Sequence, residues 1–280
     1  LLVVGDYEAL LPHLPYRGIK KSLFGAYVAF EEWALRHMVS RVLTFTNGAA
    51  LRRKHELHGQ RIVETKTTTL SLQDIGSRAD VAQSGPIRAL TVSRIDPRKG
   101  LRALPGAIAT LVADGIDVRL DIVGPTIGLI GDDERAAIAR EADARGVGDR
   151  VTLVGAVPLD RLMPLYRDYD IFILPTQPGE GIPRVLLEAM ANGLPIVTTN
   201  VSGITSLVTH EANGLLIADA SAAAVAAAVR RLAQDGELRR RLIQGGYVTA
   251  RSHTLERQAG DMMRIVATEL ALPIAFRGAA

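Results

Sequence analysis

Short apolar runs alternate with longer amphipathic stretches along the chain from residue 87 onward. The runs have the length of buried strands and read IRALTV, VRLDIVG, VTLVG, DIFILP, PIVTT and GLLI. The amphipathic stretches predict helices at 100–114, 133–145, 159–166, 183–192, 221–234, 237–250 and 254–270. Strands that alternate with such helices form βαβ units, in which helices cover both faces of a parallel sheet. The pattern therefore predicts an α/β fold, with a doubly wound, Rossmann-like parallel sheet over residues 87–252.

A smaller set of elements precedes this region. The expected strands lie at 1–4, 42–46 and 61–65, and the expected helices at 23–38 and 49–57. Because these elements make up only the last third or half of a Rossmann-like domain, we interpret residues 1–75 as the remnant of an N-terminal domain. Residues 76–86 are rich in Gly, Ser, Asp and Pro and are expected to form a linker. Residues 253–280 are expected to form a C-terminal helix and tail that pack back toward the N-terminal domain. The chain begins with Leu rather than Met, which we interpret as the start of a fragment.

Composition narrows the class of protein. Among the 280 residues 48% are apolar, which excludes a disordered chain, and no uncharged apolar run is long enough to span a membrane. The absence of cysteine excludes disulfides and thiolate metal sites and fits a reducing compartment, so the expected location is the cytoplasm. A net charge of +3 suits anionic partners such as nucleotides, phospholipid headgroups or nucleic acid.

Two carboxylates accompany the strand DIFILP. Glu180 lies in the Gly/Pro loop after the strand, and Glu188 lies on the helix that follows. Ligands of parallel sheets bind beyond the carboxyl ends of the strands, and a helical side chain leans toward the start of its helix, so both carboxylates can face one site. They would accept hydrogen bonds from sugar hydroxyls, while the start of the helix offers N–H groups to a phosphate. Alternatively, Glu188 forms a surface ion pair with Arg184, and spacing alone does not decide between the two.

Arg94 and Lys99 follow the strand IRALTV in the segment VSRIDPRKG. Loop cations are commonly only solvated. Their place directly after the carboxyl end of a strand, in the same sheet as the Glu180 loop, favours binding of an anion.

Glu180, seven intervening residues and Glu188 resemble the E-x7-E signature of glycosyltransferase family four. The segments VSRIDPRKG, RLDIVG, VTLVGAV, YRDYDIFILPT and NGLLI are similar to that family as well, in its usual order. The resemblance implies a retaining, metal-independent glycosyltransferase of the two-Rossmann-domain GT-B type. Its C-terminal domain binds the nucleotide-sugar donor, and its N-terminal domain, truncated here, binds a glycan or lipid-linked acceptor. It further implies a hexosyltransferase-like activity in cell-surface polysaccharide synthesis, with no cofactor.

Roles implied by the resemblance fall on matching positions. Glu180, Arg94 and Lys99 are the implied catalytic residues, with both cations on the donor diphosphate and Glu180 on the transferred sugar. The implied donor contacts also include Glu188 at the ribose, the backbone of Gly181 and Ile182 at the sugar or phosphate, and the backbone of Val157 at the base. The chain departs from the family at Pro183, which has no N–H to donate where many relatives have glycine.

Several alternatives remain from the residues alone. The chain is either a glycosyltransferase, a non-catalytic nucleotide-sugar-binding module, or a sugar-nucleotide epimerase of the same architecture.

The aromatic and basic stretch 16–41 is either a core helix with a charged solvent face, which we favour, or a helix that lies on the inner face of the membrane. No motif accompanies the basic residues, so a nucleic-acid partner is not expected. Asp168 and Asp170 mimic a D-x-D metal motif, but they precede a strand and fall at the opposite edge of the sheet, so we expect no metal there.

Overall fold

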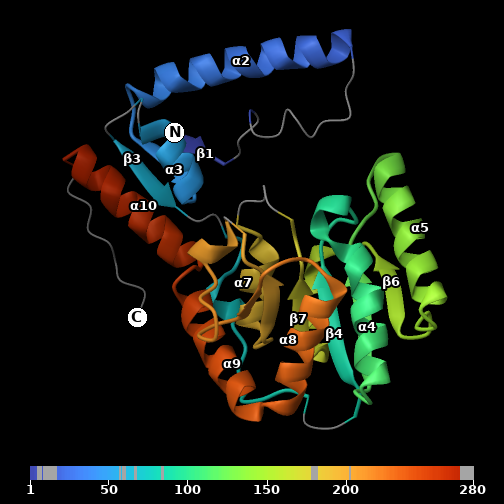
Figure 1. Ribbon diagram of the computed structural model, residues 1–280. Helices are drawn as coiled ribbons and strands as arrows, with labels where there is room; N and C mark the ends of the chain where they lie inside the picture. The colour runs from blue at the N-terminus through green and yellow to red at the C-terminus, as the bar shows by residue number, and fades with distance from the viewer. Residues whose placement is uncertain are drawn as a thin grey trace. The chain divides into compact units, whose positions relative to one another are not determined.

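The computed structural model of the chain describes residues 1–4, 8, 18–56, 58, 61–65, 68–82, 85–177, 182–201 and 203–271. The chain divides into two compact units (Figure 1). Unit 1 comprises Leu1–Thr68 and Leu255–Ala280, and unit 2 comprises Thr69–Thr254. Among the described residues, no helix combines the length and apolar character needed to cross a bilayer.

Unit 2 is built on a six-stranded parallel sheet with the order β6-β5-β4-β7-β8-β9. Its strands are β4 (Ile87–Val92), β5 (Val118–Val123), β6 (Val151–Gly155), β7 (Ile171–Leu174), β8 (Ile196–Thr199) and β9 (Leu215–Ile217). The six apolar runs of the sequence correspond to these six strands. The prediction of an α/β fold with a doubly wound parallel sheet is therefore confirmed.

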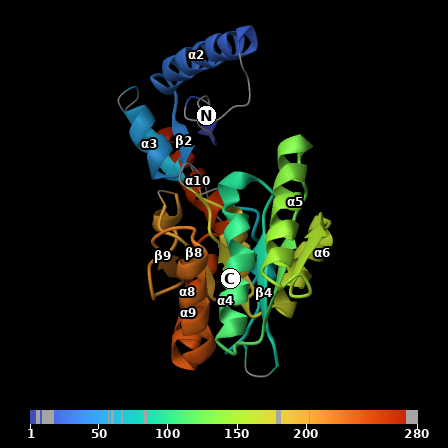
Figure 2. The same cartoon turned by 45° about the vertical axis from the view of Figure 1, so that its right-hand side comes forward.

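Helices cover both faces of this sheet: α4, α5 and α8 pack on one face and α7 on the other (Figures 1 and 2). The helices of the unit are α4 (Leu104–Ala113), α5 (Gly128–Ala144), α6 (Leu159–Leu165), α7 (Arg184–Ala191), α8 (Ala222–Gln234) and α9 (Gly236–Arg251). Short 3-10 turns are η2 (Leu72–Asp74), η3 (Pro97–Lys99), η4 (Leu101–Ala103), η5 (Tyr166–Asp168) and η6 (Ile204–Ser206). Side chains alternate between two cores: Ile171 and Ile173 pack with α4, α5 and α8, whereas Phe172 and Leu174 pack with α7. Because both faces of the strands are buried, they read as continuous apolar runs.

Helix ends agree with their capping residues. The Ser221 hydroxyl accepts the Ala224 N–H at 3.2 Å at the start of α8, and the Asp235 carboxylate accepts the Leu238 N–H at 2.9 Å at the start of α9. The predicted start of the second helix at residue 133 was wrong, because α5 begins at Gly128. Leu129 is 83% exposed, so the first turn does not follow the apolar period of a core-facing helix.

The segment before β4 forms several contacts with the rest of unit 2. Gly76 N–H donates to the Ala191 carbonyl at 2.8 Å, and Asp80 forms a buried ion pair with Arg239 at 2.9 Å. Burial alone would raise the pKa of Asp80, but hydrogen bonds from Arg239 and the Val81 N–H outweigh it and lower that pKa overall. Residues 69–82 are thus an ordered part of unit 2.

Unit 1 contains a three-stranded parallel sheet with the order β1-β2-β3. Its elements are β1 (Leu2–Val3), α2 (Ile19–Val39), β2 (Thr44–Asn47), α3 (Ala49–Glu56), β3 (Ile62–Thr65) and α10 (Leu255–Glu269). The last helix contacts both ends of β3: Gln258 donates to the Thr65 hydroxyl at 3.2 Å, and Glu269 pairs with Arg61, directly before the strand, at 3.3 Å.

Candidate functional site

The order of strands in unit 2 defines one position where the sheet topology reverses. From β4, the strands β5 and β6 continue outward on one side, and β7, β8 and β9 continue outward on the other. In open α/β sheets, ligands bind outside the carboxyl ends of the strands at such a reversal. Arg94 and Lys99 follow β4 in the chain, and Glu180 follows β7, so the candidate residues belong to the two loops that flank the reversal.

Asp96 organises the loop after β4. Its Oδ1 accepts the Arg98 backbone N–H at 3.0 Å, and its Oδ2 pairs with the Arg98 guanidinium at 2.6 Å, which fixes the turn η3. The hydrogen bonds from the Arg98 side chain lower the pKa of Asp96 to about 2, so this carboxylate is charged at neutral pH. The turn ends at Lys99, whose residue is only 8% exposed.

Arg94 lies exposed between two backbone anchors at the end of β4. Gly124, with φ of +147°, approaches so closely that a Cβ there would lie 1.8 Å from the Ser93 carbonyl oxygen. On the other side of Arg94, the Ile95 N–H donates to the Pro125 carbonyl at 2.9 Å. The charge of Arg94 also contributes to the low pKa of Asp96.

The loops after β4 and β7 are in direct contact. The Arg98 carbonyl accepts the Gln177 backbone N–H at 2.7 Å and the Thr176 hydroxyl at 3.2 Å. Gly100 lies against the same loop: its φ is +68°, and a Cβ there would be 2.1 Å from the Pro175 carbonyl oxygen. The segment that carries Lys99 is therefore held against the end of β7, directly before residues 178–181.

Glu188 lies on α7 and is buried, with 8% of the residue exposed. The Tyr166 hydroxyl donates to its Oε2 at 2.8 Å. Burial raises the pKa of Glu188, and the hydrogen bond from Tyr166 and the charge of Arg184 oppose that rise only in part. In the part of the chain that the structure describes, no hydrogen bond reaches Oε1 of Glu188. The alternative of a surface ion pair with Arg184 is wrong, because Glu188 is not at the surface and its polar partner is Tyr166.

The remaining predicted residues are distributed as follows. Ile182 and Val157 are half-buried and pack against the core formed by α7 and its face of the sheet. Glu180 and Gly181, predicted to bind the sugar, lie outside the described residues. Val157 follows β6 and Arg94 follows β4, so both residues lie at the carboxyl edge of the sheet. The backbone that is predicted to contact the base therefore belongs to the same edge as Arg94.

Two polar groups near the reversal were missed by the sequence analysis. Tyr166 is buried, and its ring packs against Phe172 in a tilted arrangement with 5.9 Å between the ring centroids. A buried aromatic residue before a strand is common, so nothing in the sequence singled out its hydroxyl. Ser93, at the end of β4, has a buried hydroxyl oxygen without a hydrogen-bond partner among the described residues. Serine is common in turns after strands, so the sequence alone does not reveal that this hydroxyl lacks a partner.

Asp170 lies at the opposite edge of the sheet and binds backbone N–H groups. Its two oxygens accept the Ala82 N–H at 3.0 Å and the Arg88 N–H at 2.9 Å. Tyr169 beside it donates to Asp121 at 2.6 Å. Within the described ranges, no group of three or more acidic or histidine side chains is arranged to hold a metal ion.

Residues 76–249 match the model of a protein family described as glycosyl transferases group 1, and this match covers more than half of the chain. The chain belongs to this family. With its doubly wound sheet, it is a member of the GT-B class of glycosyltransferase folds. The resemblance in the sequence predicted this fold class.

Two curated relatives come from polysaccharide biosynthesis. The amylovoran biosynthesis glycosyltransferase AmsK of Erwinia amylovora is 34% identical over 177 residues, which cover 61% of this chain and 40% of the relative. A putative colanic acid biosynthesis glycosyltransferase, WcaL of Escherichia coli K12, is 33% identical over 162 residues, covering 56% of this chain and 38% of the relative. The matched part thus spans about two fifths of the length of these relatives.

The fold is shared with solved structures. Anabaena Alr3699/HepE in complex with UDP-glucose superposes with a TM-score of 0.70 at 19% identity, covering 86% of this chain and 67% of that protein. At this identity the similarity establishes the fold.

Proposed function

We propose that this chain is the donor-binding part of a retaining glycosyltransferase of family four. It would transfer a hexosyl group from a nucleotide-sugar donor to a glycan or lipid-linked acceptor in cell-surface polysaccharide synthesis, without a metal or cofactor. The observation that carries the proposal is the contact between the loops after β4 and β7. The Arg98 carbonyl, bonded to Gln177 and Thr176, brings the loop with the two cations beside the loop that leads to Glu180.

The assignment of the cations follows from the chemistry of the leaving group. As the bond between the sugar and the nucleoside diphosphate breaks, negative charge develops on the diphosphate oxygens. Two fixed cations, Arg94 and Lys99, would stabilise that charge more than they stabilise the ground state. Lys99 is well suited, because η3 and the close approach of Gly100 to Pro175 hold its backbone before any ligand binds.

Glu188 is proposed to bind the donor ribose. Its Oε2 is occupied by Tyr166, so the other oxygen remains to accept hydrogen bonds from a pair of hydroxyls. In the same proposal Glu180 and the backbone of Gly181 and Ile182 contact the transferred sugar, and the backbone at Val157 contacts the base. HepE binds UDP and UDP-glucose, so UDP-glucose is the donor to test first and UDP the corresponding leaving nucleotide.

Retention, the acceptor and the location are part of the same proposal. No side-chain nucleophile is assigned, and the acceptor hydroxyl is proposed to attack on the face from which the diphosphate leaves, assisted by that diphosphate. Amylovoran and colanic acid, named for the two relatives, suggest a glycan or lipid-linked acceptor. A cytoplasmic protein that touches the inner face of the membrane would meet both a nucleotide-sugar donor and such an acceptor.

A donor titration tests the proposal. A panel of nucleotide sugars is screened by thermal shift and then by calorimetry on the chain and its Glu188→Ala variant, with Glu141→Ala on the exposed side of α5 as the control. A ligand at 100 times its Kd should add about 2.7 kcal/mol of stability. Glu188→Ala should weaken donor binding by about 1–3 kcal/mol, and the control should not. Equal binding by all three proteins would refute the site assignment, and an altered free sugar nucleotide without transfer would support an epimerase instead.

A further inference from the structure

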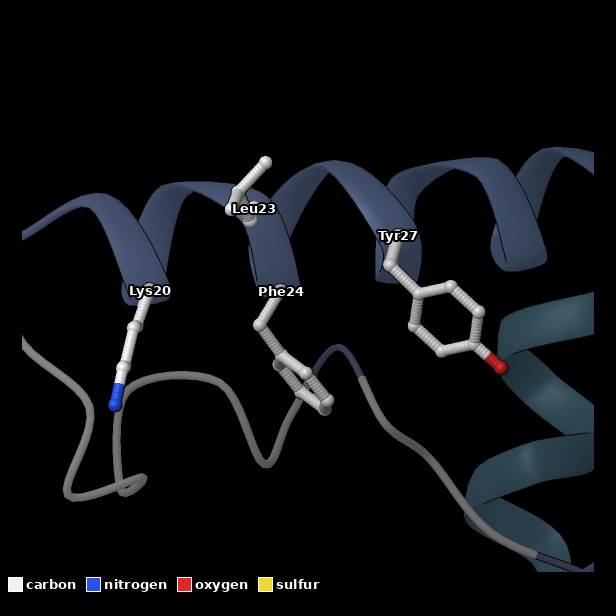
Figure 3. A pocket seen from close by; sticks show the side chains of 4 residues that line it. All are labelled: Lys20, Leu23, Phe24 and Tyr27. Carbon is white, nitrogen blue, oxygen red and sulfur yellow. The ribbon is translucent and has the colours of Figure 1, made fainter.

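Helix α2 of unit 1 carries an open pocket that is lined by Lys20, Leu23, Phe24 and Tyr27. Figure 3 shows Lys20 on the same side of the helix as the two aromatic rings, whereas Leu23 points to the other side. Phe30 and Trp33 on this helix are each 63% exposed, which differs from the expected core helix with a charged solvent face. A single cation beside apolar side chains does not specify a ligand.

Three arginines of unit 2 lie around Tyr247, a buried residue of α9. The Arg78 backbone N–H donates to the Tyr247 hydroxyl at 2.8 Å. The guanidinium carbon of Arg251 lies over the Tyr247 ring, 5.6 Å from its centroid. The third arginine, Arg167, joins this group through the end of α7. We call Arg78, Arg167 and Arg251 the arginine cluster.

Arg167 is held at the end of α7 by Asn192. Its Nε donates to Asn192 Oδ1 at 3.3 Å, and Asn192 is the C-cap residue of the helix. The next residue, Gly193, has φ of +69°, and a Cβ there would lie 2.4 Å from the Tyr247 hydroxyl oxygen and 3.2 Å from the Cβ of Arg78. Asn192 and Gly193 therefore connect Arg167 to the group around Tyr247.

The arginine cluster has no acidic partner among the described residues. None of its three side chains forms an ion pair there, although Asp168 follows Arg167 in the chain. Asp80, two residues after Arg78, is paired with another arginine at 2.9 Å. Burial raises the pKa of Tyr247, and the Arg78 N–H and the charges of all three arginines oppose that rise only in part. Since the three charges act on one hydroxyl, they also repel one another, and a bound anion would relieve that repulsion.

Most hydrogen-bond donors of the arginine cluster remain available to a ligand, because each guanidinium carries five N–H groups. Arg78 uses Nη1 to donate to the Tyr169 carbonyl at 2.7 Å. Toward described residues, Arg167 donates only through Nε, and the Arg251 side chain donates no hydrogen bond. Both of these side chains are exposed, so a solute can reach them. Planar guanidinium groups bind phosphate through paired N–H donors, and three of them suit a doubly charged anion.

The arginine cluster lies away from the residues proposed to bind the donor diphosphate. Tyr169, bonded to Arg78, precedes β7, and Gly193 precedes β8, so the cluster belongs to the amino edge of the sheet. Arg94 and Lys99 follow β4 at the carboxyl edge. We propose that the arginine cluster binds a phosphate group, carried by free phosphate or by a phosphate ester, at a second site of unit 2. The inference goes beyond the proposed function, since donor binding needs none of these three arginines.

Calorimetric titration with inorganic phosphate tests the proposal. Ionic strength is held constant with chloride, so that a general effect of salt is the same throughout. We expect saturable binding to one site. Methyl phosphate distinguishes the two sources of the group: affinity equal to that of inorganic phosphate indicates a phosphate ester, and weaker binding indicates the free ion.

Arg167→Gln and Arg251→Gln should each weaken phosphate binding about tenfold or more, because a hydrogen bond between charged groups is lost. Arg251→Lys keeps the charge without the planar fork and should recover part of the affinity. Arg140→Gln on α5 is the matched control, since it removes an exposed arginine that forms no ion pair with any described residue. This control and Lys99→Ala should bind phosphate like the parent. Urea unfolding of each variant separates lost binding from a fault in folding.

Three results would overturn the proposal. The first is no saturable heat with phosphate, as expected if the arginines only stabilise the ends of α7 and α9. The second is an equal loss of binding in Arg140→Gln, which would point to a general charge effect. The third is loss of phosphate binding in Lys99→Ala, which would place the phosphate at the carboxyl edge. Donor titration is run on the same samples, so failure of this site and failure of the proposed transferase function are recorded separately.

Discussion

The Tyr166 hydroxyl and the Glu188 carboxylate form a buried pair 2.8 Å apart, between the turn η5 and helix α7. Burial raises the pKa of both groups, and that of Tyr166 lies well above its usual value. Tyr166 therefore stays protonated at neutral pH and donates its hydrogen to the Glu188 carboxylate. The pair fixes one oxygen of Glu188. In the proposed site, the other oxygen accepts hydrogen bonds from the donor ribose.

Replacing Tyr166 by phenylalanine should shift the pH dependence of donor binding. The hydrogen bond from Tyr166 lowers the pKa of Glu188, so its loss raises that pKa further. Donor binding that needs the carboxylate is present above this pKa and is lost as the pH falls through it. In Tyr166→Phe the loss should therefore begin at a higher pH, and the free energy of unfolding should fall by about 1–3 kcal/mol. Calorimetric titration of donor across a pH series checks the shift.

Tyr247→Phe is the control for this experiment. The Tyr247 hydroxyl accepts the Arg78 N–H at 2.8 Å and does not contact Glu188. This variant should lose stability but keep the pH midpoint of donor binding. The same midpoint in Tyr166→Phe and the parent would mean that Tyr166 does not act through Glu188.

The sheet could be predicted from the sequence because the alternation of apolar runs and amphipathic helices can be recognised within short segments of the chain. The central strands β7 and β8 are buried on both faces, so runs such as IFIL are apolar throughout and can be recognised without knowledge of their neighbours. Lys99 and Glu188 could be singled out as candidates, because position after a strand and tilt on a helix follow from chain order. The Tyr166 hydroxyl could not, since it depends on a contact across 22 residues. The exposure of Trp33, which is 63% exposed, could not be decided from the sequence, because an aromatic helix face looks the same whether the fold covers it or not.

Gly100→Ala should damage both stability and donor binding. The residue has φ of +68°, and an added Cβ would meet the Pro175 carbonyl oxygen at 2.1 Å, so the loops after β4 and β7 must separate. Gly115→Ala is a matched control, since its φ is +79° and nothing lies within 4 Å of the new Cβ. We expect about 1–2 kcal/mol of strain in the control and a clearly larger loss in Gly100→Ala. Urea unfolding measures both, and equal losses would contradict the importance of the contact.

Lys99→Ala should weaken donor binding. Removal of a cation from a diphosphate should cost about 1.5–3 kcal/mol of binding free energy, as for a hydrogen bond to a charged group. Arg119→Ala removes an exposed cation from β5, away from the carboxyl edge, and should leave donor affinity unchanged. Calorimetry with UDP alone is the most direct readout, because it isolates the diphosphate contacts from those of the sugar. Parent-like affinity for UDP in Lys99→Ala would remove this residue from the site.

Asp170→Ala separates a structural aspartate from a metal-binding one. Its oxygens accept two backbone N–H groups, from Ala82 and Arg88, and so join the segment before β4 to the start of β7. Loss of both hydrogen bonds leaves one part-buried donor, the Ala82 N–H, and one exposed donor, the Arg88 N–H, without this partner, so the free energy of unfolding should fall by about 1–3 kcal/mol. The opposite edge of the sheet carries the proposed donor site, so donor affinity per folded molecule should not change. Because Asp170→Asn keeps one acceptor oxygen, it should recover part of the stability. Donor binding that depends on divalent cation in the parent and loses that dependence in Asp170→Ala would show that the D-x-D segment binds a metal after all.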